Sequence, residues 1–156
     1  MVEENINLRK AKIGDVPQIH TLVNSFATRG EMLGRSRSEL YEGLRDFFVV
    51  ELDDAILGCS ALHINWEDLA EVRSLAVLPE GQGKGLGRLL VNACVEEARS
   101  LGIPRVYALT YRPDFFERVG FSKVSKESLP HKVWGDCLKC PKFPNCDEDA
   151  MTMELN

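Results

Sequence analysis

The stretch PEGQGKGLGRLL, residues 79–90, places glycine at alternating positions directly before an apolar helical pattern. These glycines are Gly81, Gly83, Gly85 and Gly87. The first backbone N–H groups of a helix have no acceptor within the helix and lie at the positive end of its dipole. Glycines remove the side chains that would keep a phosphate away from those groups. The stretch therefore predicts a phosphate-binding turn; the alternative is a glycine-rich turn that binds nothing.

Two better-known phosphate motifs do not fit this stretch. A dinucleotide-binding fingerprint needs a third glycine at position 88, where the chain has Arg88. A P-loop needs serine or threonine after its lysine, but Lys84 is followed by Gly85. The ligand expected at the turn is therefore neither a dinucleotide of the Rossmann type nor a nucleotide of the P-loop type.

Two charged side chains interrupt the apolar strand pattern of residues 71–78 just before the glycines. Glu71 and Arg73 are two residues apart, so both project from one side of a strand. Charged residues are unusual in a strand expected to be buried, and they indicate a site. The alternative is a structural ion pair at the surface of the sheet.

The segment RGEMLGRSR, residues 29–37, concentrates arginines in a chain whose net charge is −5. Guanidinium groups bind carboxylates in a bidentate manner. We expect Arg35, Ser36 and Arg73 to bind a carboxylate of the substrate, although any one arginine could equally be solvated surface charge.

A cysteine-rich loop at about 129–149 is expected between the last two strands. Cys137 and Cys140 have the spacing of a zinc knuckle, and His131 and Cys146 could complete a tetrahedron. Only one such pair is present, so a packed loop without metal is the alternative.

The hydrophobic periodicity predicts one mixed α/β unit with the element order βααβββαβαββ. Asp15 is expected to cap the first helix, and Ser36 with Glu39 forms a capping box for a second helix whose apolar face includes Phe47. The strands are expected at residues 6–11, 47–52, 55–64, 71–78, 105–110, 121–124 and 151–155, and the later helices from Leu86 to Gly102 and over 113–119.

The composition narrows the class of protein. The 156 residues suit a single domain, 1–156, and 44% hydrophobic with 28% charged residues is typical of a globular protein. The acidic balance argues against a nucleic-acid partner, and no apolar run is long enough to span a membrane. The N-terminus lacks the apolar core of a signal peptide, so a cytoplasmic location is expected.

The sequence QGKGLG, residues 82–87, resembles the Gln/Arg-x-x-Gly-x-Gly/Ala motif of the GCN5-related N-acetyltransferase (GNAT) family. LAVLPE (75–80) and FFERVGF (115–121) also stand where that family places them. The resemblance implies the GNAT fold, with a mixed, mostly antiparallel sheet flanked by helices, and acetyl-coenzyme A as the acetyl donor. It further implies that the pyrophosphate binds the N–H groups of Gln82, Gly83, Lys84, Gly85, Leu86, Gly87 and Arg88, and that the pantetheine arm pairs with the backbone of Leu75, Ala76 and Val77.

The chain looks most like the short bacterial N-acetylglutamate synthases in three segments: RGEMLGRS (29–36), EVRSLAV (71–77) and the tail from Leu129 to Met151. This likeness implies that the acceptor is the α-amine of L-glutamate and that the reaction is the first step of arginine biosynthesis. The chain is then expected to act as a monomer or a homodimer. An acetyltransferase for another amino acid, small amine or peptide N-terminus, and a non-catalytic acyl-coenzyme A sensor, are the alternatives.

Acetyl transfer to an amine needs a base that removes the ammonium proton, and Glu71 is the candidate, directly or through water. The oxyanion would accept a hydrogen bond from a backbone N–H of residues 75–77. Where many family members carry a tyrosine that protonates the leaving thiolate, this chain has Phe116. Tyr111 is a substitute candidate, while Phe115 and Phe116 are better read as an apolar wall.

Overall fold

The computed structural model describes residues 5–130 and 148–155 of the chain. Its elements follow in the order predicted from the sequence. The strands are β1 (Ile6–Lys10), β2 (Phe47–Leu52), β3 (Ala55–Trp66), β4 (Leu69–Val77), β5 (Arg105–Thr110), β6 (Ser122–Val124) and β7 (Asp149–Glu154). The helices are α1 (Val16–Thr28), α2 (Arg37–Glu42), α3 (Leu86–Leu101) and α4 (Pro113–Val119).

The strands form one seven-stranded sheet in the order β1-β2-β3-β4-β5-β7-β6. Every neighbouring pair is antiparallel except β4 and β5, which are parallel. The turn between β2 and β3 holds Asp53 and Asp54 at φ 50° and 67°, as a tight hairpin with primed geometry requires. The mixed, mostly antiparallel sheet expected from the sequence is therefore present.

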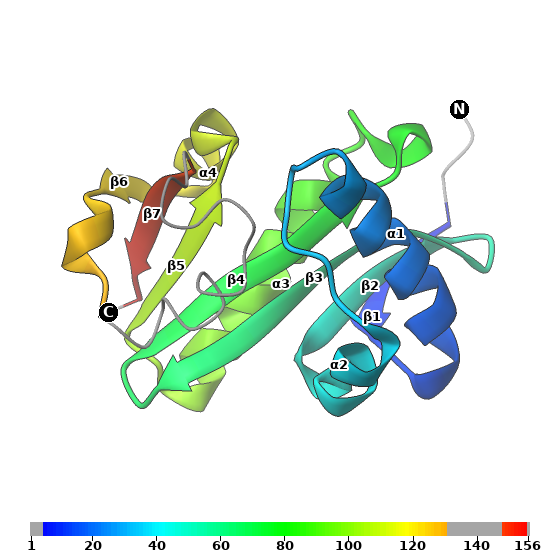
Figure 1. Ribbon diagram of the computed structural model, residues 1–156, viewed down its shortest axis with the longest axis horizontal. Coiled ribbons are helices and arrows are strands. Elements are labelled where there is room, and N and C mark those ends of the chain that lie inside the picture. Colours follow the sequence, from blue (N-terminus) through cyan, green and yellow to red (C-terminus); the bar gives the residue numbers. More distant parts are fainter. Residues whose placement is uncertain (1–4, 131–147, 156) are drawn as a thin grey trace.

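Helices cover both faces of the sheet (Figure 1). One apolar cluster packs α1 and α2 against the strands through side chains such as Ile19, Val23 and Leu40. Another cluster packs α3 and α4 on the opposite face, with Val91, Cys94 and Phe116 among its members. In β3, Cys59 and Ser60 show the alternation: Cys59 belongs to the α1 cluster, while the Ser60 hydroxyl donates to the carbonyl of Leu90 in α3 at 3.2 Å.

The helix ends agree with the sequence in most places and differ in two. Gly85 and Gly102 flank α3 in the left-handed conformation. Separately, no helix of the described residues is long and apolar enough to cross a membrane. Asp15 does precede α1, but it makes no side-chain cap: its carboxylate accepts from the N–H of Lys12 at 2.7 Å and binds Arg9. Phe47 is not part of a second helix, because α2 ends at Glu42 and Phe47 opens β2.

Candidate active site

A β-bulge interrupts β4 in the middle of the sheet. Ser74 has φ 56°, a conformation that side-chain-bearing residues rarely adopt, and the register between β3 and β4 shifts there. On the other edge, the paired positions of β4 and β5 are Ala70 with Val106 and Glu71 with Tyr107. Beyond Glu71 the edge of β4 therefore turns its backbone toward a space between the two strands instead of toward a neighbouring strand.

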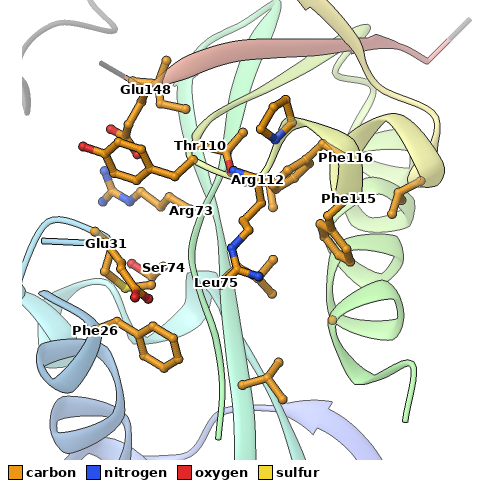
Figure 2. Close-up of a pocket in the computed structure, with 18 of the residues that line it drawn as sticks. Phe26, Glu31, Arg73, Ser74, Leu75, Thr110, Arg112, Phe115, Phe116 and Glu148 are labelled. Atoms are coloured by element: carbon orange, nitrogen blue, oxygen red, sulfur yellow. The ribbon is translucent and has the colours of Figure 1, made fainter. Parts of the chain in front are cut away.

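This space is part of a cavity of about 1210 Å³ that runs from the loop after α1 to the N-terminus of α3 (Figure 2). Most residues predicted for the site line it. They are Arg35, Glu71, Arg73, Leu75, Val77, Gln82, Gly83, Gly85, Leu86, Gly87, Arg88, Tyr111, Phe115 and Phe116. Ala76 and Lys84 are not among the lining residues; the Ala76 side chain is buried in the α1 cluster.

The glycine turn forms one end of the cavity and carries the geometry of an anion site. Gly83 and Gly85 have φ 80° and 77°, and a Cβ built on either would meet no atom within 4 Å. The first helical bond runs from the N–H of Leu89 to the carbonyl of Gly85 at 3.1 Å. The N–H groups of residues 86–88 precede that bond and have no partner within the helix. The turn therefore presents bare backbone to the cavity at the positive end of a 16-residue helix.

Side-chain packing fixes this turn in place. The Gln82 amide donates to the carbonyl of Val77 at 3.1 Å, which ties the turn to the end of β4. A Cβ at Gly81 would lie 2.9 Å from a Leu86 methyl group, so that glycine is needed for close packing. A Cβ at Gly87 would lie 3.2 Å from the ring of Phe115, so this ring packs directly against the start of α3 (Figure 2).

Charged side chains gather at the other end of the cavity. The carboxylate of Glu71 lies 3.7 Å from the guanidinium of Arg73, with side-chain exposures of 14% and 19%. The Arg35 side chain is 10% exposed, and its Nη1 lies 3.4 Å from the Glu39 carboxylate. The pKa of Glu39 is lowered, chiefly because it accepts a hydrogen bond from the Ser36 N–H. The predicted same-side arrangement of Glu71 and Arg73 is thus present, and Arg35 lines the same cavity.

Ser36 has a structural role at this end of the cavity and does not line it. Its hydroxyl accepts from the N–H of Glu39 at 3.1 Å, and Glu39 accepts in return from the Ser36 N–H at 3.2 Å. This is the capping box expected from the sequence. The hydroxyl oxygen is used to start α2, and binding of substrate by Ser36 stays a prediction.

Sequence reasoning missed several residues that line the cavity. Figure 2 shows Arg112 and Thr110 at the end of β5, with Glu31 and Glu148 on two other walls. The Thr110 hydroxyl accepts from the N–H of Arg112 at 2.8 Å and so orders the backbone from which that arginine projects. The available signal for Arg112 was the strand–helix–strand order of residues 71–110, which favours two parallel strands whose carboxyl ends meet at one edge of a sheet.

The candidate zinc ligands His131, Cys137, Cys140 and Cys146 lie outside the described residues. Within the described part of the chain, no group of three or more His, Cys, Asp or Glu side chains could hold a metal ion. The two described cysteines, Cys59 and Cys94, are free and buried. Burial raises the pKa of both thiols to about 12, so they stay protonated and are not nucleophiles.

Comparison with known proteins agrees with this geometry. The family model of the acetyltransferase (GNAT) family matches residues 17–121. An uncharacterized N-acetyltransferase of Chlorobaculum tepidum is 40% identical over 95% of this chain and 96% of its own length. An amino-acid acetyltransferase of Mycobacterium tuberculosis is 36% identical over 85% of this chain and 77% of its own length.

Solved structures give the same result. N-acetylglutamate synthase from Neisseria gonorrhoeae, complexed with coenzyme A and N-acetylglutamate, superposes with a TM-score of 0.88 at 29% identity. The match covers 99% of this chain but only 36% of the Neisseria chain. A Mycobacterium tuberculosis protein in complex with coenzyme A and a second ligand superposes with a TM-score of 0.84 at 31% identity, covering 96% of this chain and 99% of its own. The chain described here is an acyltransferase and belongs to the GNAT acetyltransferase family.

Proposed function

We propose that this protein transfers the acetyl group of acetyl-coenzyme A to the α-amine of L-glutamate, as in the first step of arginine biosynthesis. The observation that carries the proposal is the continuity of the cavity, which joins the glycine turn to the cluster of Glu71, Arg73 and Arg35. Relatives named amino-acid acetyltransferase, and a structural neighbour that binds N-acetylglutamate with coenzyme A, support an amino acid as the acceptor.

The donor end fits a pyrophosphate by its shape and charge. The open space above Gly83 and Gly85 leaves room for phosphate oxygens, and the N–H groups of residues 86–88 would donate to them. Arg88 adds a positive side chain at the same wall. Backbone groups of Leu75, Ala76 and Val77, on the edge of β4 beyond its pairing with β5, would hold the pantetheine arm. Acetyl-coenzyme A supplies the thioester whose carbonyl carbon is attacked.

The acceptor end would bind carboxylates and remove a proton. Arg35 and Arg73 offer guanidinium groups, and Arg112 adds a third from the end of β5. Glu71 would take a proton from the acceptor's ammonium group, directly or through water, and so free the nitrogen lone pair for attack. A backbone N–H after the bulge at Ser74 would donate to the oxygen that becomes negative in the transition state.

Protonation of the leaving thiolate needs no strong acid from the protein, because an ordinary thiol titrates near ~8.5. Phe116, at the position where the family resemblance implies a tyrosine, is 4% exposed and packs edge-to-face on Phe121, so it acts as an apolar wall. Tyr111 lines the cavity after β5 and is the side-chain candidate for donating a proton.

The test is turnover of acetyl-coenzyme A, followed by thiol release, with each of the common amino acids, small amines and a peptide N-terminus as acceptor. We expect kcat/KM to be highest for L-glutamate. A higher value for another acceptor would reassign the substrate within the same chemistry. Saturable turnover with any amine excludes the non-catalytic sensor, which the enzyme names of the relatives already disfavour.

A further inference from the structure

The Asn24 side chain, in the middle of α1, binds both backbone groups of Arg35 across the loop of residues 29–36. Its amide oxygen accepts from the Arg35 N–H at 3.2 Å, and its amide nitrogen donates to the Arg35 carbonyl at 2.8 Å. The same nitrogen donates to the carbonyl of His20 at 2.9 Å, one turn back along α1. A single carboxamide thus joins the loop to the helix as a neighbouring strand would, with donor and acceptor both used.

The loop is shaped to accept this contact. A Cβ built at Gly34 would lie 2.7 Å from the Asn24 amide oxygen and 3.4 Å from the Ala27 methyl group. Glycine at 34 therefore lets the backbone approach α1 closely enough for both hydrogen bonds to Arg35. On the other side of Arg35, the capping box of Ser36 and Glu39 fixes the start of α2.

These contacts fix the backbone from which the Arg35 side chain projects. Arg35 lines the cavity and its side chain is 10% exposed, although the residue belongs to no helix or strand. An arginine on an unanchored loop would lose both backbone and side-chain conformational entropy when it binds a carboxylate. An arginine whose backbone is already held on both sides loses less conformational entropy on binding, so its affinity for a carboxylate is higher.

We propose that Asn24 is a positioning residue that holds Arg35 for binding the acceptor's carboxylate. The inference rests on the proposed function for the identity of the acceptor. It adds that acceptor affinity is set partly by a side chain of α1 that is not itself among the residues lining the cavity.

The kinetic test compares Asn24→Ala with Thr21→Ala, an exposed position on the same helix whose hydroxyl donates only to the Pro17 carbonyl at 3.1 Å. Asn24→Ala should raise KM for the acceptor by about ten-fold, while KM for acetyl-coenzyme A stays unchanged. Thr21→Ala should change neither. In an Arg35→Ala background, Asn24→Ala should have no further effect on acceptor KM, because the two residues act as one unit. Equal changes in both KM values, or a full additional effect in that background, would overturn the proposal.

The chemistry of the carboxamide gives a second variant. Asn24→Asp keeps the acceptor for the Arg35 N–H but puts an oxygen where the amide nitrogen now donates to the carbonyls of Arg35 and His20. It should therefore behave like Asn24→Ala rather than rescue it. If Asn24→Asp had the same KM for the acceptor as the wild type, the role of the Asn24 amide nitrogen as a hydrogen-bond donor would be contradicted.

Amide hydrogen exchange separates this inference from the proposed function. Exchange of residues 33–37 should be faster in Asn24→Ala than in the wild type, while exchange in α3 is unchanged. If glutamate proves not to be the acceptor, the kinetic comparison is made with the best acceptor found, and the exchange result stands by itself. Unchanged exchange of residues 33–37 would overturn the positioning role whichever amine is acetylated.

Discussion

Glu71 is the residue whose removal should affect chemistry most directly. Glu71→Gln keeps the shape of the side chain but cannot accept the ammonium proton, so kcat should fall by about 10²- to 10⁴-fold while KM for acetyl-coenzyme A changes little. The exposed Glu67→Gln, in the turn between β3 and β4, is the matched control. Steady-state kinetics over a range of pH check this, and full kcat at every pH would remove Glu71 from the mechanism.

The residues of the site could be predicted from sequence where local geometry determines them. Glu71 and Arg73 lie together because a strand places every second side chain on one face. Ser36 was predicted to cap α2 and to bind substrate, and the structure shows the cap. The role of Asn24 could not be predicted from the sequence, because its side chain binds a loop residue, Arg35, that stands eleven positions later in the chain.

At the level of elements, the junction of the glycine turn with α3 can be tested with two glycines of the same conformation. Gly85 and Gly102 have φ 77° and 83°, flank the same helix, and would each direct a Cβ into open space. Asparagine tolerates this conformation, so Gly85→Asn and Gly102→Asn should each lower the stability of the fold by a similar, modest amount. Only Gly85→Asn places a side chain in the cavity, and it should weaken coenzyme A binding at least several-fold.

Calorimetric titration with coenzyme A, beside melting curves for both variants, checks this prediction. Gly102→Asn is expected to bind as the wild type does. Equal affinity in a folded Gly85→Asn would show that the pyrophosphate does not lie on this turn.

The bulge in β4 is the element feature that sequence reasoning did not find. Beyond Ser74 the alternation is displaced by one: Leu75 packs on the α3 side and Ala76 on the α1 side. The sequence EVRSLAV does not predict a left-handed backbone conformation at Ser74, because glycine and not serine is the residue that favours it. By contrast, α4 and the β2–β3 hairpin were correctly bounded, because proline, glycine and paired aspartates mark their ends.

The conformation of Ser74 leads to a stability prediction. A β-branched side chain at φ 56° is strongly disfavoured, so Ser74→Val should destabilise the fold by about 1–3 kcal/mol. Ser74→Gly adopts this backbone freely and should stay close to the wild type. Chemical denaturation measures both changes. Equal stability of the two variants would mean that position 74 does not need its left-handed backbone.

For the whole molecule, the order of elements followed from the sequence, but the order of strands in the sheet did not. β7 pairs with β5 on one edge and β6 on the other, although β6 precedes it in the chain. That insertion depends on pairings between distant residues, such as Thr110 with Asp149, which no local pattern encodes. The same topology leaves β4 and β5 parallel and separated beyond Glu71, which is what makes room for the cavity.

A charge network remote from the cavity ties the first strands to α1. Arg9 on β1 binds the Asp15 carboxylate at 2.7 Å and the Glu51 carboxylate on β2 at 3.1 Å. Hydrogen bonds from Arg9 lower the pKa of both acids, and the two acids raise the pKa of Arg9. Because the folded-state pKa values of the acids lie below those in the unfolded chain, the network stabilises the fold above a pH of about 4. That stabilisation is lost as the pH falls through the folded-state values.

Arg9→Met keeps much of the aliphatic stem but leaves Asp15 and Glu51 without their shared cation. At pH 7 it should lower Tm by roughly 3–10 °C, and the difference from the wild type should shrink as the pH falls below about 4 and through the folded-state pKa values of the two acids. Arg99→Met is the control, because Arg99 and Glu96 form an exposed pair on α3, with side-chain exposures of 45% and 68%, that contributes little. Melting curves from pH 7 down to pH 2 measure the effect. A loss of Tm that stays constant over this range would assign the stabilisation to packing of the Arg9 stem instead of its charge, since only the charged interaction depends on the protonation of its partners.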